Sequence, residues 1–256
     1  MTVDLYYFQP LGTNSGRVYL ALLEKGVPFV EHELSGRDFE HLKPAYLAIN
    51  PKGQVPTLVH DGVALPEGML INEYIDETFD GPALRPDSAE ERWRMRVWSR
   101  YAENDLGRCL MMINWNRVVP SFAGDRTPEE MKAFLEKTVP DPDRRRSWLS
   151  AFEQRTDPAA IEESHRRTRA GAHKVDAHLR EHRWMAGTSF SLADIDLFCF
   201  CGFMTSWMPE IVNEADTPAW VEWYNRVAER PAVKEMRART KMTFARPGAQ
   251  PLKAEA

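Results

Sequence analysis

The sequence predicts an α/β domain with a mixed four-stranded sheet, followed by an all-α domain that forms a helical bundle. In residues 1–80, short strand-like runs alternate with helical patterns. In residues 89–243, apolar residues recur near every third or fourth position, and no strand signal of comparable strength is found. Residues 81–88 contain two prolines and one glycine, which is typical of a linker.

The first domain has the predicted order β-α-β-α-β-β-α, which indicates a mixed sheet with helices packed on it. Its first helix ends before Gly26, a residue common just after a helix. Its last two strands flank Asp61-Gly62, a dipeptide that favours a tight hairpin. The predicted elements, in order, are Val3–Phe8, Gly16–Lys25, Phe29–Leu34, Phe39–Ala48, Val55–His60, Val63–Leu65 and Gly68–Phe79.

The second domain is predicted to be entirely helical. Residues 244–256 contain few apolar side chains, so we expect them to form a loose tail. The predicted helices are Ala89–Asn116, Pro128–Thr138, Arg144–Phe152, Pro158–His182, Leu192–Met208 and Ala219–Arg239.

Composition and charge narrow the class of protein. With 43% hydrophobic and 28% charged residues, the chain resembles an ordinary globular protein. Its net charge of −5, with acids spread along the chain, argues against nucleic acid as a partner. No run approaches 18 apolar residues, and the first residues lack the pattern of a signal peptide. We therefore expect a cytoplasmic protein with no membrane partner.

The cysteines predict neither a disulfide framework nor a metal site. The chain has three, Cys109, Cys199 and Cys201, and their odd number and spacing fit neither arrangement. The last two lie in an apolar run, where small buried side chains are expected. We expect no metal and a reducing compartment.

The segment Asn50–Leu58 contains the first candidate binding residues. Pro56 follows a glycine-containing turn and precedes a strand, so the Val55–Pro56 bond is a plausible cis peptide. Such a turn presents the Val55 N–H and C=O to an extended peptide, which binds as an added strand. An ordinary tight turn would explain the same residues.

The second candidate segment is the start of the helix at Gly68. The free N–H groups of a helix N-terminus attract a carboxylate, and Glu67 beside them could receive an ammonium group. A zwitterionic amino-acid end, such as the γ-glutamyl group of glutathione, needs both. The alternative is an acidic residue that simply favours the helix dipole.

Polar side chains also surround the start of the first helix. Thr13, Asn14 and Ser15 lie in the turn between the first strand and this helix. They either cap the helix, as Ser and Asn often do, or one of them donates a hydrogen bond to a bound thiolate. By contrast, Ser191-Leu192-Ala193-Asp194 has the pattern of a structural capping box.

Together, these segments resemble the glutathione transferase superfamily over nearly the whole chain. The most specific marks are residues 50–58, Glu67 with the helix after it, and the Ser191–Asp194 segment. The resemblance implies a thioredoxin-like first domain that binds glutathione as cosubstrate, a helical domain that adds the second-substrate pocket, and a homodimer. It places glutathione at Thr13, Val55, Pro56, Glu67 and Gly68, with its glycyl carboxylate near His41 and Gln54.

Two positions depart from the common pattern of the family. Many serine-type members carry the catalytic hydroxyl where this chain has Gly12, and many carry Ser or Thr where it has Gly68. The Asn14-Ser15 pair instead resembles the nu-like transferases and the bacterial beta-aryl etherases of lignin breakdown. We therefore expect Ser15 and Asn14 to activate glutathione, whose thiolate attacks a small aromatic electrophile and releases a phenol from a beta-aryl ether.

Two other functions stay open: a nu-like glutathione-dependent disulfide reductase or peroxidase, and a glutathione-binding protein without turnover. No cysteine occurs near Ser15, which disfavours cysteine-based exchange.

The second substrate is expected in an apolar pocket between the domains, although helical aromatic residues often belong to the core. The candidate pocket residues are Gln9, Tyr101, Met111, Met112, Trp115, Phe203 and Trp207.

Overall fold

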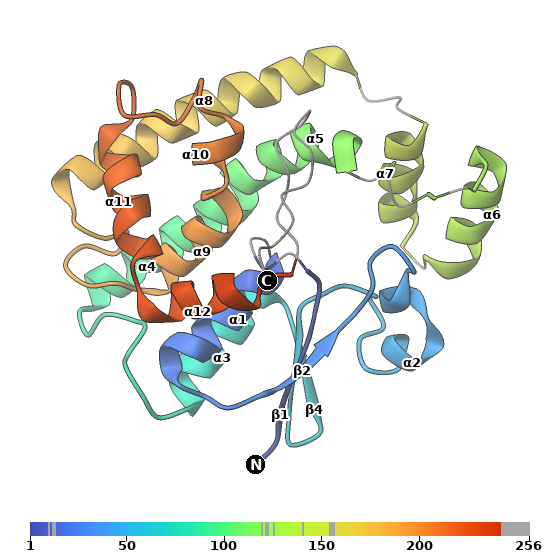
Figure 1. Cartoon of the computed structure of the whole chain (residues 1–256), viewed down its shortest axis with the longest axis horizontal. Coiled ribbons are helices and arrows are strands. Elements are labelled where there is room, and N and C mark those ends of the chain that lie inside the picture. The colour runs from blue at the N-terminus through green and yellow to red at the C-terminus, as the bar shows by residue number, and fades with distance from the viewer. Residues whose placement is uncertain are drawn as a thin grey trace.

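The computed structural model describes residues 1–9, 11, 14–118, 120, 123–124, 126–139, 141–153 and 157–241, without the side chains of residues 115–118. Thr13, the Trp115 side chain and the predicted tail 244–256 lie outside the described part. Figure 1 shows the sheet at the base of the molecule and the helical domain above it.

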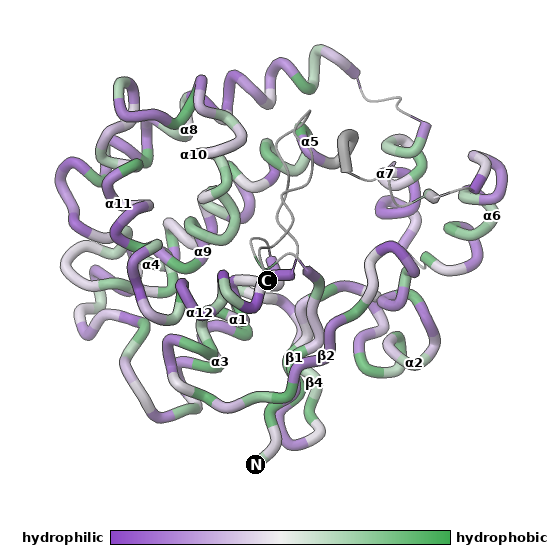
Figure 2. Tube along the Cα trace, viewed as in Figure 1, coloured by the Kyte–Doolittle hydropathy of each residue, from purple (hydrophilic) through white to green (hydrophobic). Residues whose placement is uncertain are grey.

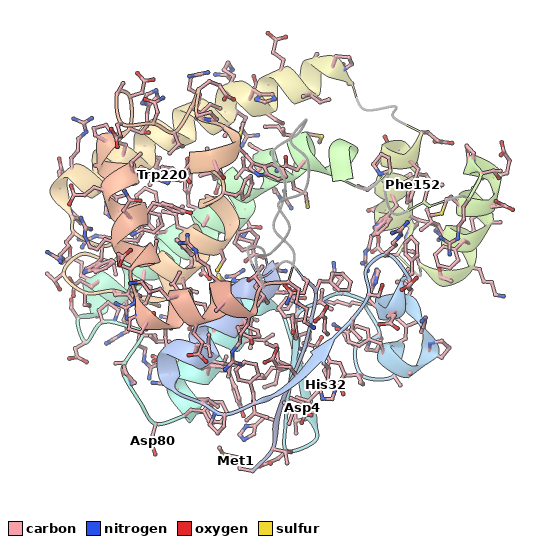
Figure 3. All side chains as sticks on the ribbon, in the orientation of Figure 1. Met1, Asp4, His32, Asp80, Phe152 and Trp220 are labelled. Carbon is pink, nitrogen blue, oxygen red and sulfur yellow. The ribbon has the colours of Figure 1, made fainter. Side chains whose placement is uncertain are left out.

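The first domain contains the predicted mixed sheet of four strands, in the order β2-β1-β3-β4. β1 runs parallel to β2 and antiparallel to β3, so Leu5 lies between Glu31 and Leu58. Asp4 and His32 lie side by side on β1 and β2, with Oδ1 and Nε2 2.7 Å apart (Figure 3). The strands are β1 (Val3–Tyr7), β2 (Val30–Glu33), β3 (Thr57–His60) and β4 (Val63–Pro66).

Helices cover both faces of this sheet because side chains alternate along β1. Leu5 and Tyr7 point into the main core, where the Tyr7 ring lies 5.5 Å from Tyr19. Tyr6 points the other way, and its ring lies 5.8 Å from Tyr46. The helices are α1 (Asn14–Lys25), the 3₁₀ turn η1 (Glu40–Leu42), α2 (Pro44–Leu47) and α3 (Gly68–Thr78), so the predicted element order is confirmed.

The second domain is helical, as predicted, but three predicted helices are subdivided. Ala89–Asn116 contains a π-helical turn, and Leu192–Met208 and Ala219–Arg239 each form two helices. The last break occurs before Pro231, which begins a new helix because proline disfavours helical backbone in the residue before it. The elements are α4 (Ala89–Arg100), η2 (Tyr101–Leu106), α5 (Gly107–Val118), α6 (Pro128–Thr138), α7 (Pro142–Phe152), α8 (Pro158–Glu181), α9 (Leu192–Cys201), α10 (Met204–Trp207), α11 (Pro218–Ala228) and α12 (Pro231–Arg239).

The predicted capping box at the start of α9 is present. Ser191 and Asp194 exchange hydrogen bonds there, and Asp194 Oδ1 also accepts from the Met185 N–H and from Trp223 Nε1. Asp194 is fully buried, and burial raises its pKa to about 6. This network fixes the direction in which α9 enters the core.

The two domains share one hydrophobic core, because α1 packs against α3 of its own domain and against α9 and α12 of the other. Arg17 of α1 also crosses the boundary. Its Nε lies 2.8 Å from Asp196 Oδ1 on α9, and its Nη1 lies 2.8 Å from Glu103 Oε2 on η2. The Arg17 side chain is 0% exposed.

Figure 2 shows hydrophilic residues interrupting the hydrophobic ones along the longest helix, α8. Among the helices that the structure describes, none is long and apolar enough to cross a membrane.

Candidate active site

The structure brings together the three turns that the sequence singled out. The Asn14 Nδ2 atom lies 3.4 Å from the Val55 carbonyl oxygen. A β-carbon added to Gly68 would lie 2.9 Å from Asn14 Oδ1. The Val55–Pro56 peptide is cis, as predicted. The start of α1, the turn before β3 and the start of α3 therefore converge on Asn14.

The Ser15 hydroxyl accepts one hydrogen bond and can donate another. Its hydroxyl oxygen accepts from the Phe8 N–H at 3.0 Å, and the side chain is 1% exposed. A hydroxyl that accepts one bond keeps its proton for another partner. The positive end of the α1 dipole lies at the same place, so this turn favours a bound anion.

Asn14 has spare hydrogen-bonding capacity. At 3.4 Å, its bond to Val55 is longer than the usual 2.7–3.2 Å. Its Oδ1 atom is buried and has no hydrogen-bond partner among the described residues. Buried polar atoms without partners are uncommon and often mark a functional position.

The glycine at position 68 is explained by its neighbours. A β-carbon there would lie 2.9 Å from Asn14 Oδ1 and 3.1 Å from Arg17 Cδ. Real β-carbons essentially never approach within 3.0 Å, so a serine at this position would displace Asn14. Sequence reasoning missed this steric link, although a glycine at the first position of a helix was a signal for it. With glycine, the main-chain N–H groups of α3 remain as anion donors.

Glu67, immediately before α3, has an uncommon backbone conformation. Its φ of 74° and ψ of 95° are unusual for a residue with a β-carbon, and such conformations cost about 1–3 kcal/mol and cluster at functional sites. Its carboxylate lies 2.7 Å from Lys52 Nζ, and both side chains are exposed. An exposed pair of this kind is weak, so Glu67 is available to another cation.

His41 and Gln54 flank the same region but differ in exposure. The His41 side chain is 2% exposed, and its ring lies edge-on to Phe8 at 5.0 Å. Burial, assisted by the charge of Arg144, lowers the His41 pKa to about 3, so the ring is neutral at neutral pH. The Gln54 carbonyl accepts from Asn50 Nδ2 at 2.9 Å, whereas its side chain is exposed. Their glutathione contacts stay predictions.

The candidate second-substrate residues are only partly brought together. The rings of Phe203 and Trp207 lie 5.6 Å apart, and Met111 and Met112 are exposed on α5. Gln9 reaches the end of α12, where its Nε2 donates to the Arg239 carbonyl at 3.3 Å.

Tyr101 has contacts of a different kind. Its ring packs edge-on against Trp98 at 5.4 Å, and Lys174 Nζ lies 4.1 Å above it. These contacts place Tyr101 between α4 and α8, in a packing role, and the common pocket with Trp115 stays a prediction.

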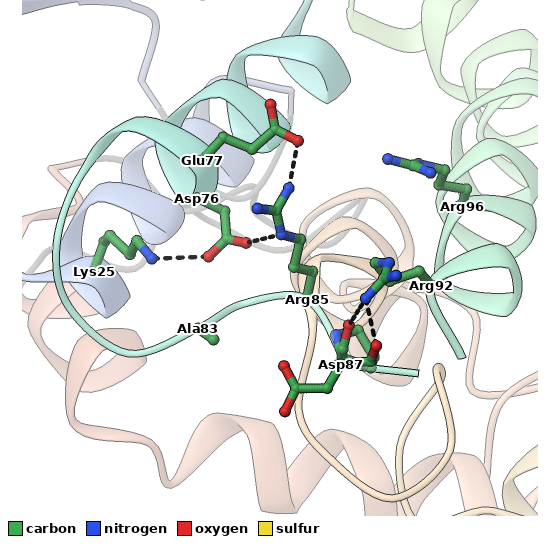
Figure 4. Close-up of a pocket in the computed structure, with 9 residues that line it drawn as sticks. Lys25, Asp76, Glu77, Ala83, Arg85, Asp87, Arg92 and Arg96 are labelled. Atoms are coloured by element: carbon green, nitrogen blue, oxygen red, sulfur yellow. Dashed lines mark hydrogen bonds and ion pairs between the residues drawn. The ribbon is translucent and has the colours of Figure 1, made fainter. Parts of the chain in front are cut away.

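An open cavity of about 610 Å³ lies at the linker, at the opposite end of α1 (Figure 4). Lys25 there is ten residues from Ser15, which is about 15 Å along a helix. Lys25 Nζ lies 2.9 Å from Asp76 Oδ1, and Asp76 also accepts from the Leu84 N–H and pairs with Arg85. Because these charges are paired with one another, we interpret this region as the anchor of the linker.

Within the described residues, no group of three or more His, Cys, Asp or Glu side chains could hold a metal ion. Cys109, Cys199 and Cys201 are free and buried. Burial raises the pKa of each thiol, so none is a ready nucleophile.

Replacing Glu67 tests both its carboxylate and its backbone. Glu67→Ala should weaken glutathione binding by about 1–3 kcal/mol, because a charged partner is lost. Glu67→Gly should weaken binding equally but unfold at a higher temperature than Glu67→Ala, because glycine tolerates positive φ. Calorimetry and thermal unfolding measure these two effects. Glu90→Ala, on the exposed face of α4, is the control, and an unchanged affinity in both Glu67 variants would contradict the assignment.

Comparison with known proteins agrees with this geometry. Residues 13–78 match the family described as glutathione S-transferase, N-terminal domain, and residues 158–226 match glutathione S-transferase, C-terminal domain. Protein LigF of Sphingobium sp. is 31% identical over 249 residues, which cover 94% of this chain and 95% of LigF. Glutathione S-transferase 2 of Saccharomyces cerevisiae is 30% identical over 91% of this chain and 88% of the yeast protein.

Solved structures give the same result. The crystal structure of β-etherase LigF from Sphingobium sp. strain SYK-6 matches with a TM-score of 0.87 over 93% of this chain and 99% of that chain, at 31% identity. Glutathione transferase F7 from Populus trichocarpa matches with a TM-score of 0.69 over 93% of this chain and 98% of that chain, at 25% identity. The two matched domains, their order and the three converging turns of the first domain lead to one conclusion: the chain belongs to the glutathione S-transferase family and is a glutathione transferase.

Proposed function

We propose that this transferase is a glutathione-dependent β-aryl etherase that acts on small aromatic ethers of the kind released from lignin. The observation that carries the proposal is the likeness over the full length to a β-etherase, at a TM-score of 0.87. Asn14, which meets Val55 and Gly68, and the adjacent Ser15 supply the means of activating the thiol.

In this proposal, Ser15 and Asn14 donate hydrogen bonds to the sulfur of bound glutathione. A thiol with a pKa of about 8.5 is only a few per cent ionised at pH 7, and a pKa about two units lower makes the thiolate the main form. Two neutral hydrogen bonds contribute roughly 0.5–1.5 kcal/mol each, and the helix dipole roughly 0.3–1 kcal/mol. Together these are of the size needed, since one pKa unit is about 1.4 kcal/mol.

The proposed reaction is a substitution at carbon. The thiolate forms a C–S bond to the carbon that bears the aryloxy group, and the C–O bond breaks. The bonding electrons leave with the phenolate oxygen, which is acidic enough as a phenol to depart without a strong general acid. The products are a glutathione thioether and a phenol, and neither an oxidant nor a reductant is consumed.

A panel of substrates tests this proposal. The purified protein should release phenol from β-aryl ethers next to a ketone in proportion to glutathione consumed, with slower turnover of a general aromatic halide. Chromatography of both products measures the ratio. Turnover of a glutathione mixed disulfide or a peroxide without release of phenol would instead favour the nu-like reductase activity.

We also propose that the protein is a cytoplasmic homodimer. Its three free, buried cysteines fit a reducing compartment. Leu70 on α3 and Trp93 and Val97 on α4 are large exposed apolar side chains, and the ion pair between Glu73 and Arg96 joins the same two helices. Exposed apolar residues that cluster in this way are typical of interfaces.

Light scattering at micromolar concentration should give about twice the 29.5 kDa mass of the chain. Trp93→Glu should shift the mass toward one chain, because it would bury an unpaired charge at the interface. Trp184→Phe, a conservative change in the core, is the matched control. A wild-type mass near 29.5 kDa would contradict the dimer.

A further inference from the structure

The hairpin of α6 and α7 packs against the sheet domain, beside α2 and away from α8 and α11 (Figure 1). It lies outside both family matches, which cover residues 13–78 and 158–226. The Phe39 ring lies 4.8 Å from Phe134 of α6 and 5.7 Å from Trp148 of α7. Phe152, at the end of α7, packs on Trp148 at 5.9 Å (Figure 3). The hairpin therefore forms a second core with the segment around η1.

Arg144 of α7 reaches from this hairpin into the loop before β3. Its Nη1 donates to the Lys52 carbonyl at 2.6 Å, and its Nη2 donates to the Gly53 carbonyl at 2.8 Å. Gly53 is itself confined, because a β-carbon there would lie 2.9 Å from the His41 carbonyl oxygen. The loop leads directly to Val55, so Arg144 holds the approach to the predicted peptide-binding turn.

Arg144 has no recorded ion pair among the described residues. Both of its recorded hydrogen-bond acceptors there are neutral carbonyl groups, and Asp141 is the carboxylate that favours its charge. The side chain is half-buried, and burial lowers its pKa, although Asp141 opposes that effect. A half-buried cation without an anionic partner is unfavourable unless a ligand supplies one.

The other candidates for a counter-charge to the glycyl carboxylate are less suited to that role than Arg144. His41 is neutral, because its pKa is about 3. Gln54 is an uncharged amide, and Lys52 Nζ, which lies 2.7 Å from Glu67, is on an exposed side chain whose charge is screened by solvent. An extended peptide advances about 3.5 Å per residue. A tripeptide that begins at Glu67 and pairs with Val55 therefore ends within a few ångströms of this loop.

We propose that Arg144 is a positioning residue of the glutathione site, which holds the Lys52–Gly53 loop and supplies the positive charge opposite the glycyl carboxylate. The inference rests on the proposed placement of glutathione at Val55 and Glu67. It makes the α6–α7 hairpin a part of the glutathione site and Arg144 a determinant of specificity for a ligand with a carboxylate at its glycyl end.

Calorimetry with two ligands tests this role: glutathione and its glycyl ethyl ester, which lacks that carboxylate. Arg144→Gln should weaken glutathione binding by about tenfold and ester binding by about threefold at most, since only glutathione loses a charge interaction. Arg144→Lys should weaken both ligands but keep much of the preference for glutathione, because it keeps the charge and loses the two-pronged bond. Arg146→Gln is the matched control. Arg146 lies two residues further along α7, and its exposed side chain pairs with Asp143. This variant removes the same charge and should change neither affinity.

Equal weakening of both ligands in Arg144→Gln would overturn the charge role, and unchanged binding of both would overturn the positioning role as well. If Arg144→Gln does not fold, the ligand preference of Arg144→Lys decides, and loss of that preference in a folded variant would overturn the proposal. Wild-type protein that binds neither ligand would contradict the glutathione site itself. Wild-type protein that binds both ligands equally would leave that site standing and overturn only the inference about Arg144.

Discussion

Replacing Ser15 with alanine should slow glutathione-dependent turnover by about 3- to 100-fold, and the Asn14→Ala/Ser15→Ala double variant should lose more. Asn14 lies where the start of α1 meets Val55 and Gly68, and Ser15, the next residue of α1, accepts from the Phe8 N–H. Losing one neutral donor costs about 0.5–1.5 kcal/mol, and more in a dry, preorganised site. The two losses need not add, because neighbouring donors to one sulfur share a network.

The ionisation of the bound thiol separates activation from helix capping. Donors favour the thiolate and lower its pKa, so removing them should raise the pKa and move the acid limb of the activity profile to higher pH. Ultraviolet absorbance of the thiolate against pH measures this directly.

Melting temperature alone cannot separate the two roles. Ser15→Ala also leaves the Phe8 N–H without its recorded acceptor, and an unpaired buried donor costs about 1–3 kcal/mol of stability. Glutathione affinity should change much less than turnover, since most of the tripeptide is held elsewhere. An unshifted titration in both single variants and in the double variant would exclude these residues from activation.

Much of the fold could be predicted because its signals are local. Pro128 at the first turn of α6 and the Thr127 cap before it explain why that helix begins where the sequence pattern placed it. Asp61 and Gly62 both have positive φ, as a tight hairpin requires. Pro231 was a local signal for the break between α11 and α12, but the helical periodicity on either side of it led to the prediction of one continuous helix.

Other features depend on contacts between distant residues. The π-helical turn at Tyr101–Leu106 interrupts a smooth helical pattern and places Glu103 against Arg17, 86 positions away. Likewise, the turns at Asn14 and Gly68 were each recognised, yet their steric dependence appears only when the two helix starts meet. The bond between Arg144 and Gly53 spans 91 positions and left no local signal.

Arg17→Met should destabilise the protein by about 3–5 kcal/mol, the usual effect of removing one partner from a buried ion pair. Asp196 is 1% exposed and would lose the guanidinium 2.8 Å away. The donors that would remain are neutral. Asn72 Nδ2 lies 3.4 Å from the same oxygen, and the Ser99 hydroxyl also favours the carboxylate, but neither replaces a full charge. Glu103 is 34% exposed and can be solvated, so the penalty should come from Asp196.

The pH dependence should identify Asp196 as the source. Burial already raises the Asp196 pKa, and Arg17 opposes that rise, so the pKa should be higher still in Arg17→Met. A carboxyl group whose folded pKa exceeds its unfolded value of about 3.9 destabilises the fold as pH rises through that interval. The defect of Arg17→Met should therefore be largest at neutral pH and shrink as the solution becomes acidic, which urea unfolding at several pH values measures.

A second variant separates the lost ion pair from lost packing. Arg17→Met/Asp196→Leu should recover most of the stability at neutral pH, because well-packed apolar replacements of a buried pair are often neutral. Arg146→Met, which removes an exposed arginine, should change stability by less than about 0.5 kcal/mol. A loss of unfolding free energy below about 1 kcal/mol in Arg17→Met at neutral pH would be smaller than expected for a broken buried pair. The interaction that joins α1 to α9 would then be weaker than its burial implies. If the double variant recovers nothing, the apolar stem of Arg17 rather than its charge holds the two domains together.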